Sequence, residues 1–181
     1  MRKWIGSVLL LAGVAVIPAE SVAQRRPAAR PAAAPAQGTR FAAELNWSSD
    51  RDFGIGARGV FGLQSLFPRT PLDGIVSFDI FFPGKPAGTT SLSYWEINGD
   101  VAYRFRVPAR SSLAPYAGGG LNIAHLSSTV GGVSGSTTKA GLNLLGGTTF
   151  KVKGSALTPF VEGRGEIGGG KTFVLTGGVR F

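Results

Sequence analysis

The sequence predicts an all-β fold: an eight-stranded antiparallel up-and-down transmembrane β-barrel. Three observations lead to this prediction. Eight segments alternate apolar and polar residues, the segments are long, and aromatic residues gather at their ends. Alternation with a period of two gives a strand one apolar and one polar face. Strands of soluble proteins average about 5–6 residues, whereas a tilted strand needs about 9–11 residues to cross a bilayer.

The first four predicted strands carry large apolar side chains on one face and charged or small ones on the other. They cover about residues 40–48, 52–63, 73–82 and 95–107. The pattern is clearest in the fourth, where Trp95 and Ile97 flank Glu96. Long alternating strands of this kind favour a sheet with an apolar medium on one side.

The last four predicted strands continue the pattern to the end of the chain. They cover about residues 113–125, 139–152, 158–167 and 171–181. The fifth is rich in glycine, which suits a crowded or sharply curved sheet. Small polar loops are predicted at one end of the barrel, and shorter turns at the other. The loops are residues 83–93 and 126–138, and the turns are residues 64–72 and 108–112.

Aromatic side chains of the apolar faces sort by strand end, which predicts two girdles around a lipid-facing wall. The expected outer girdle contains Trp47, Phe53, Phe82, Trp95 and Phe173. The expected inner girdle contains Phe41, Phe61, Phe105, Phe150 and Phe181. A soluble barrel of the lipocalin kind would turn its apolar face inward and its charged face to water.

The first forty residues read as a signal peptide and a tether. Residues 1–23 have a positive start, a 13-residue apolar stretch from Ile5 to Ile17, and small residues before a cleavage site after Ala23. A spanning helix would need about 20 apolar residues. Residues 24–39 are rich in Pro, Ala and Arg, and predict an extended basic spacer that could touch anionic lipid or the cell wall. The barrel is expected to occupy residues 40–181.

The remaining composition excludes several classes of function. The chain has no cysteine and one histidine, so neither thiol chemistry nor a metal site is expected, and no cofactor is implied. The net charge of +9 is spread along an alternating pattern and not clustered in a recognition motif, so nucleic acid is not an expected partner.

The polar faces of the strands would line the inside of the barrel. An eight-stranded barrel is just wide enough for side chains to fill, and charges buried there must pair. We therefore expect a network of ion pairs that plugs the lumen, with Glu44 on Arg58, and with Glu162 and Arg164 near Arg180 and Arg104. The network is predicted to contain Glu44, Arg58, Asp79, Glu96, Asp100, Arg104, Glu162, Arg164, Glu166 and Arg180.

Two further segments and the chain end carry a resemblance to a family. Pro115 to Leu121, Pro159 to Arg164, and the terminal Phe181 resemble the small outer-membrane β-barrels of the OmpA, OmpW and opacity types. The resemblance implies a place in the bacterial outer membrane, with both termini in the periplasm. It implies contact with membrane lipid and lipopolysaccharide, and with periplasmic chaperones and the barrel-insertion machinery during assembly. The implied insertion signal comprises Phe173, Leu175, Val179 and Phe181.

Three functions follow as hypotheses. The first is a non-enzymatic barrel with a structural or surface role and a plugged lumen. The alternative is a narrow porin-like channel for small or apolar solutes. A minor alternative is a lipid A-modifying enzyme, because His125 and Ser127 share a strand face, as in deacylases that use a His-x-Ser arrangement. No orienting carboxylate stands near them in the sequence.

Overall fold

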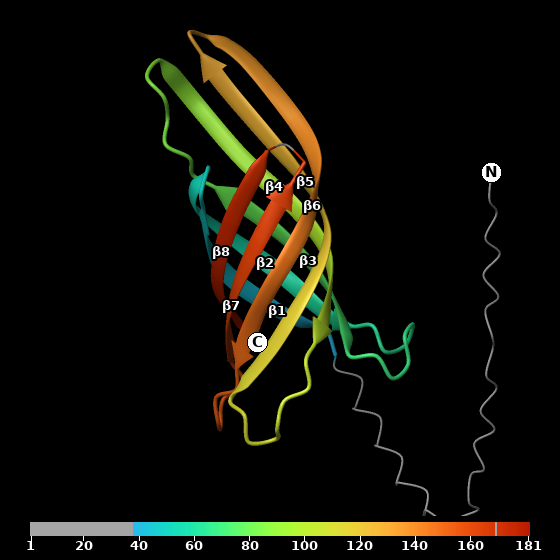
Figure 1. The fold of residues 1–181 in the computed structure, drawn as a ribbon. Coiled ribbons are helices and arrows are strands. Elements are labelled where there is room, and N and C mark those ends of the chain that lie inside the picture. The colour runs from blue at the N-terminus through green and yellow to red at the C-terminus, as the bar shows by residue number, and fades with distance from the viewer. Residues whose placement is uncertain (1–37, 169) are drawn as a thin grey trace, which may run out of the picture. The chain divides into compact units, whose positions relative to one another are not determined.

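The computed structural model describes residues 38–168 and 170–181. The predicted signal peptide, and all of the predicted tether except its last two residues, lie outside the described residues. The described chain forms eight antiparallel strands in sequence order, and β1 pairs with β8 to close a barrel (Figure 1). The strands are β1 (Arg40–Ser48), β2 (Asp52–Gly62), β3 (Leu72–Phe81), β4 (Thr89–Arg104), β5 (Leu113–Val130), β6 (Val133–Phe150), β7 (Thr158–Ile167) and β8 (Lys171–Arg180).

The predicted alternation of faces is present in the burial of the side chains. In β1, Leu45 and Trp47 are exposed on the outside, while Glu44 and Asn46 are buried inside. In β7, Glu162 and Arg164 are buried in the same way. The distribution of side chains is therefore the reverse of that in a water-soluble barrel, with charged groups in the interior and large apolar groups outside. The predicted all-β fold with eight up-and-down strands is confirmed.

The prediction of loops at residues 83–93 and 126–138 was wrong in part. Residues 126–138 belong to β5 and β6, which pair up to Val130 and Val133 and turn at Gly131 and Gly132. Both glycines have positive φ, 56° and 83°, which a two-residue hairpin turn requires. Residues 89–93 likewise belong to β4. The serine and threonine residues here were interpreted as loop residues, although threonine is enriched in β-strands.

These longer strands make a three-stranded extension, defined here as residues 89–94 of β4, 124–130 of β5 and 133–140 of β6. Along it β4 pairs with β5 and β5 with β6, whereas β6 pairs with β7 only from Leu142 to Thr149. The extension rises beyond the tips of β7 and β8, at the barrel end opposite the start of β1 and the end of β8 (Figure 1). We call this the open end, and the end where β1 begins and β8 finishes the terminal end.

At the terminal end β4 stops earlier than expected. The fourth strand was predicted to run to Val107, but β4 ends at Arg104, and residues 105–112 form the connection to β5. Pro108 lies just beyond, and a proline cannot donate the backbone hydrogen bond that a continued strand needs.

Apolar side chains also occupy the interior, near both ends. Val60, Ile75, Ala102, Tyr116 and Leu145 form one cluster, and Phe81, Tyr94 and Val174 form another. Val60, Leu145 and Val174 were not assigned to the inner face from sequence. Among the described residues no helix is long and apolar enough to span a membrane.

Candidate functional site

The first charged cluster of the lumen is centred on Arg58 of β2. Its two Nη atoms donate to the carboxylate oxygens of Glu162 at 2.9 and 3.0 Å, and its Nε donates to Glu44. The Tyr116 hydroxyl adds a hydrogen bond of 2.8 Å to Glu162. The guanidinium also lies over the ring of Phe160, with its carbon 4.6 Å from the ring centroid. Because β2 and β7 are not neighbours in the sheet, this bidentate pair crosses the lumen.

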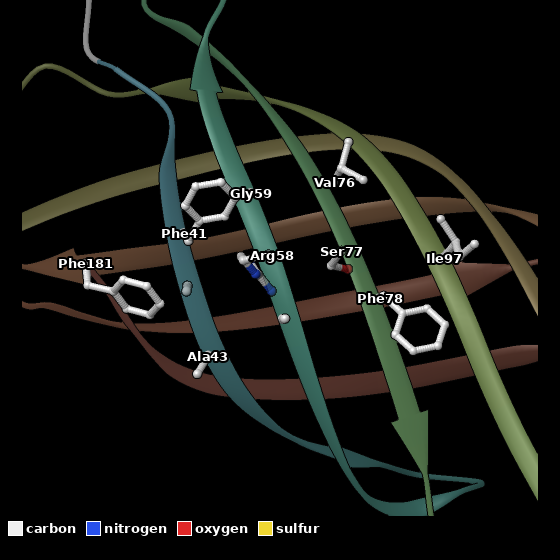
Figure 2. Close-up of a pocket in the computed structure, with 11 residues that line it drawn as sticks. Phe41, Ala43, Arg58, Gly59, Val76, Ser77, Phe78, Ile97 and Phe181 are labelled. Carbon is white, nitrogen blue, oxygen red and sulfur yellow. The ribbon is translucent and has the colours of Figure 1, made fainter.

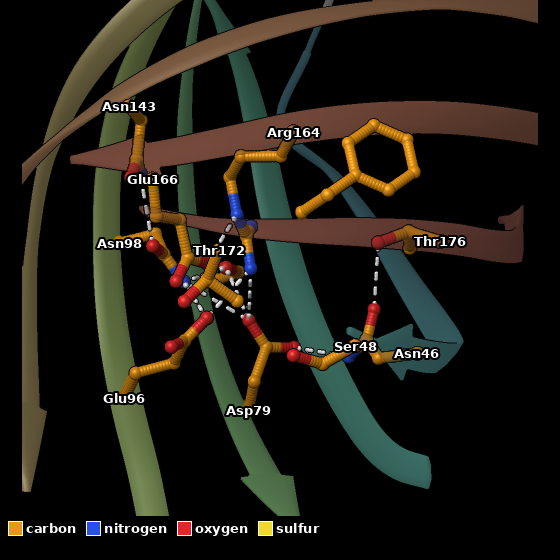
Figure 3. Close-up of polar contacts among 12 residues, drawn as sticks. Asn46, Ser48, Asp79, Glu96, Asn98, Asn143, Arg164, Glu166, Thr172 and Thr176 are labelled. Atoms are coloured by element: carbon orange, nitrogen blue, oxygen red, sulfur yellow. Dashed lines mark hydrogen bonds and ion pairs between the residues drawn. The ribbon is translucent and has the colours of Figure 1, made fainter. Parts of the chain in front are cut away.

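The second cluster is centred on Arg164 of β7 (Figure 3). Its Nη2 lies 2.7 Å from Glu96 and 3.4 Å from Asp79, and its Nε donates to Glu166 at 3.1 Å. The side chains of Arg164, Glu96 and Asp79 are at most 1% exposed. One cation thus holds carboxylates from three strands, and removing it would leave those charges buried without their partner.

Neutral side chains complete the coordination of these carboxylates (Figure 3). Asp79 accepts hydrogen bonds from Asn46 at 2.7 Å and from Asn98 at 3.0 Å. Asn143 donates to Asp100 at 3.0 Å and to Asn98 at 2.9 Å. Within the described residues Glu44 Oε1 and Asn143 Oδ1 remain buried without a hydrogen bond, so the network is extensive but not fully satisfied.

Arg51 is a member of the network that the sequence analysis missed. It lies in the turn between β1 and β2, and its Nη1 contacts Glu96 at 2.7 Å and Glu166 at 2.8 Å. Its guanidinium carbon sits 4.3 Å from the centroid of the Tyr94 ring. The period-two pattern assigns faces only to strand residues, so it could not place Arg51, which lies in a turn. The predicted interior contained more acidic than basic residues, and this imbalance could have indicated a missing cation.

The lumen contacts at the terminal end differ from the expected ones. Arg104 pairs with Asp73 at 3.1 Å, and Arg180 lies over the rings of Phe160 and Tyr116, 5.1 and 5.4 Å from their centroids. Glu162 was expected near Arg180 and Arg104; its salt bridge is with Arg58, and its charge also interacts with that of Arg180. Arg164 was expected there too, and instead holds Asp79, Glu96 and Glu166. The pair of Glu44 with Arg58 is as expected.

The outside of the barrel is an apolar wall. Nine of the ten aromatic residues predicted for the two girdles are more than a third exposed, and Trp95 is partly buried. Trp47 pairs with Phe53 across the turn at the open end. Phe41 and Phe181 exchange backbone hydrogen bonds at the terminal end. The structure therefore puts the two sets near opposite ends of the wall.

A shallow groove of about 660 Å³ crosses this wall over β1 to β4 (Figure 2). It arises because Ala43, Ala57 and Gly59 are small, whereas Phe41 and Phe78 beside them are large. Arg58 belongs to the same stretch of β2, but its guanidinium is inside the lumen. The groove is thus an apolar feature of the outer surface and is separate from the charged network.

His125 and Ser127 lie on the outer face of β5 within or beside the extension. The His125 ring stacks on Trp95, with centroids 5.1 Å apart and planes at 22°, and its Nδ1 lies 2.8 Å from the Thr138 hydroxyl. These contacts are an indole and a hydroxyl, neither of which is the acid that a catalytic histidine uses for orientation. Among the described residues no group of three or more His, Asp or Glu side chains is arranged to hold a metal ion.

Comparisons with solved structures find barrels of the same architecture. Neisserial surface protein A is 19% identical with a TM-score of 0.59, and the match covers 78% of this chain and 94% of that one. The N-terminal β-barrel domain of Pseudomonas aeruginosa OprF is 15% identical with a TM-score of 0.60, covering 81% and 98%. The attachment invasion locus protein Ail of Yersinia pestis is 15% identical with a TM-score of 0.46, and the match covers 79% of this chain and 95% of that one.

No protein-family model matches the chain, and no curated sequence matches it. The first two structural likenesses are high in coverage and low in identity, so they establish the fold. The chain has the fold of the eight-stranded outer-membrane β-barrels, as its sequence resemblance predicted.

Proposed function

We propose that the protein is a non-enzymatic integral protein of the bacterial outer membrane, with a structural or surface role and a lumen closed to solutes. The observation that carries this proposal is the bidentate pair of Arg58 and Glu162 across the lumen. The Arg164 cluster adds a second set of contacts from β7 to β3 and β4. An open pore would need this space for water, whereas here side chains occupy it.

The outer wall supports the membrane part of the proposal. Exposed leucine, isoleucine, valine and phenylalanine side chains surround the strands, among them Leu45, Ile55, Phe78 and Leu144. Lipid tails can cover such a surface, whereas in water an exposed apolar surface of this kind would promote aggregation. Membrane lipid and lipopolysaccharide are therefore the proposed neighbours of the wall, with Trp47, Phe53, Phe41 and Phe181 among the interfacial aromatics.

The orientation and assembly of the barrel belong to the same proposal. Both ends of the described chain are at one end of the barrel, which we assign to the periplasm, so that the extension faces the exterior. During assembly the last strand would present Phe173, Leu175, Val179 and Phe181 to chaperones and to the insertion machinery. The basic tether of residues 24–39 would lie on the periplasmic side, within reach of the cell wall.

The experiment that tests the closed lumen is conductance across a planar bilayer. The mature protein is refolded into vesicles, its insertion is verified by protease protection, and it is then fused to the bilayer. We expect no discrete current steps from the wild type. As a positive control, the double variant Arg58→Ser, Glu162→Ser removes the pair that crosses the lumen, and we expect steps from it. Reproducible steps from the wild type would contradict the proposal and favour a narrow channel for small solutes.

A further inference from the structure

We propose that the open end of the barrel is a binding site for a small amphipathic molecule with an apolar body and a neutral hydrogen-bonding head. A cavity of about 510 Å³ lies there, between the inner face of the extension, the β3–β4 loop and the mouth of the lumen. Ligand sites in proteins commonly have volumes of about 300–1,000 Å³. The site goes beyond a closed structural barrel, because it does not require passage through the lumen.

One side of the cavity is apolar. Leu92, Ala124 and Leu126 line it from β4 and β5. They share the inner face of the extension because Tyr94 is paired with Leu126, which sets their register. Pro83 and Pro86 of the β3–β4 loop also line the cavity. These side chains would contact the body of a ligand rather than its head.

The charged groups of the cavity are already paired or balanced. Arg51 contacts Glu166 and Glu96, and the Thr172 hydroxyl donates to Asp50 at 2.8 Å. The lining contains two cations, Arg51 and Lys139, and two anions, Asp50 and Glu166. A charged ligand head would therefore find no excess of opposite charge here, which argues for a neutral one.

Asn122 is the polar side chain that points to a ligand. It lines the cavity and is only 6% exposed, and its side-chain amide makes no hydrogen bond within the described part of the chain. By contrast, Asn46 and Asn98 of the lumen each both donate and accept a side-chain hydrogen bond. Its amide atoms are not among the unpartnered polar atoms that are sealed from solvent, so they open into the cavity, and an Asn amide can both donate and accept. A carboxamide or hydroxyl head would satisfy it.

The test uses hexanamide as the probe, with a primary amide as head and a five-carbon chain as body. The mature protein in lipid nanodiscs is labelled at Asn side-chain amides and Leu methyl groups, and is titrated while NMR shifts are recorded. We expect saturable shifts at the Asn122 amide and the Leu126 methyls. Acetamide, which lacks the body, and hexanoate, which carries a charged head, should bind at least tenfold more weakly.

Three variants separate a specific site from general partitioning. Asn122→Leu keeps the size of the side chain and should weaken binding at least tenfold. Leu126→Ala, at a partly exposed position, should weaken it about threefold or more. Ser127→Ala is the matched control on the opposite face of β5 and should bind like the wild type. Non-saturable shifts, equal binding by Asn122→Leu and the wild type, or an equal response to acetamide would each overturn the proposal. If Asn122→Leu does not fold, the Leu126→Ala result and the probe series decide.

Discussion

Arg58 and Glu162 meet across the lumen of the barrel, with both guanidinium Nη atoms 2.9 and 3.0 Å from the two carboxylate oxygens. They lie 104 residues apart in the chain. This geometry is the bidentate one that planar guanidinium and carboxylate groups favour. The pair joins β2 to β7 through the lumen, and we call it the crossbar.

Glu162→Gln should strongly destabilise the barrel. The substitution keeps the shape of the side chain but leaves Arg58 with only Glu44 to neutralise it. Removing one partner of a buried pair typically costs about 3–5 kcal/mol. We expect a loss of that size in the free energy of unfolding, measured by urea titration in lipid vesicles. Lys151→Gln, which removes an exposed charge, is the control, and an equal effect of both variants would contradict the role of the pair.

Arg51→Gln should cost less, because this side chain is 14% exposed and sits at the mouth. It leaves Glu96 and Glu166 in contact with Arg164 but without their second cation. Hydrogen bonds to charged groups contribute about 1.5–3 kcal/mol, and we expect a loss in this range. The double variant Arg51→Gln, Glu166→Gln should recover part of it. Arg110→Gln, in an exposed loop, serves as the control, and a strictly additive double variant would argue against the contact.

Gly118→Ala should impair folding, whereas Gly99→Ala should not. A Cβ at Gly118 would run into the backbone of Val101 and Ala102, while a Cβ at Gly99 would meet nothing within 4 Å. Overpacking typically costs about 1–3 kcal/mol, and a backbone clash cannot be relieved by a rotamer change. The refolded fraction, measured by the heat-modifiable shift in gel mobility, should fall for Gly118→Ala only. Equal yields would show that the strands separate more easily than this packing implies.

The tip of the extension should be dispensable for barrel stability. Deleting Thr129, Val130, Val133 and Ser134 keeps the Gly131–Gly132 turn and removes two residue pairs, so the faces of both strands are preserved. Because these residues pair only with β4 and with each other, the thermal midpoint should stay within about 4 °C, which corresponds to roughly 1 kcal/mol or less for a chain of this size. A large drop would mean that the extension stabilises the barrel below it.

The alternation alone was sufficient to predict that the acidic strand residues of the expected network enter the lumen, because a period of two determines the face of a strand residue. Glu44, Asp79 and Glu166 are all inside for this reason. It predicted the pair of Glu44 with Arg58 on neighbouring strands, but it was not sufficient to predict the partners across the lumen. Contacts across the barrel depend on strand tilt and stagger, which bring Glu162 to Arg58 and Arg164 to Asp79.

The remaining differences come from residues whose type was ambiguous. Serine and threonine occur both in loops and in strands. Only the pairing across β5 and β6 shows that Ser127, Thr129 and Ser134 belong to strands. Arg51 lies in a turn, where no periodicity applies, and its long side chain reaches into the lumen. Asn122 is buried on the inner face of β5, and only the three-dimensional structure shows that its side-chain amide has no hydrogen bond within the described residues.

The crossbar also bears on how the chain reaches its final state. Arg58 and Glu44 come together within the first hairpin, but Glu162 arrives only with the seventh strand. Until then the guanidinium has an incomplete set of counter-charges, and in a lipid environment such an intermediate is high in free energy. Closing the ring and neutralising its interior are therefore a single event, so partly inserted forms should be short-lived and the transition between unfolded and closed chain should be steep.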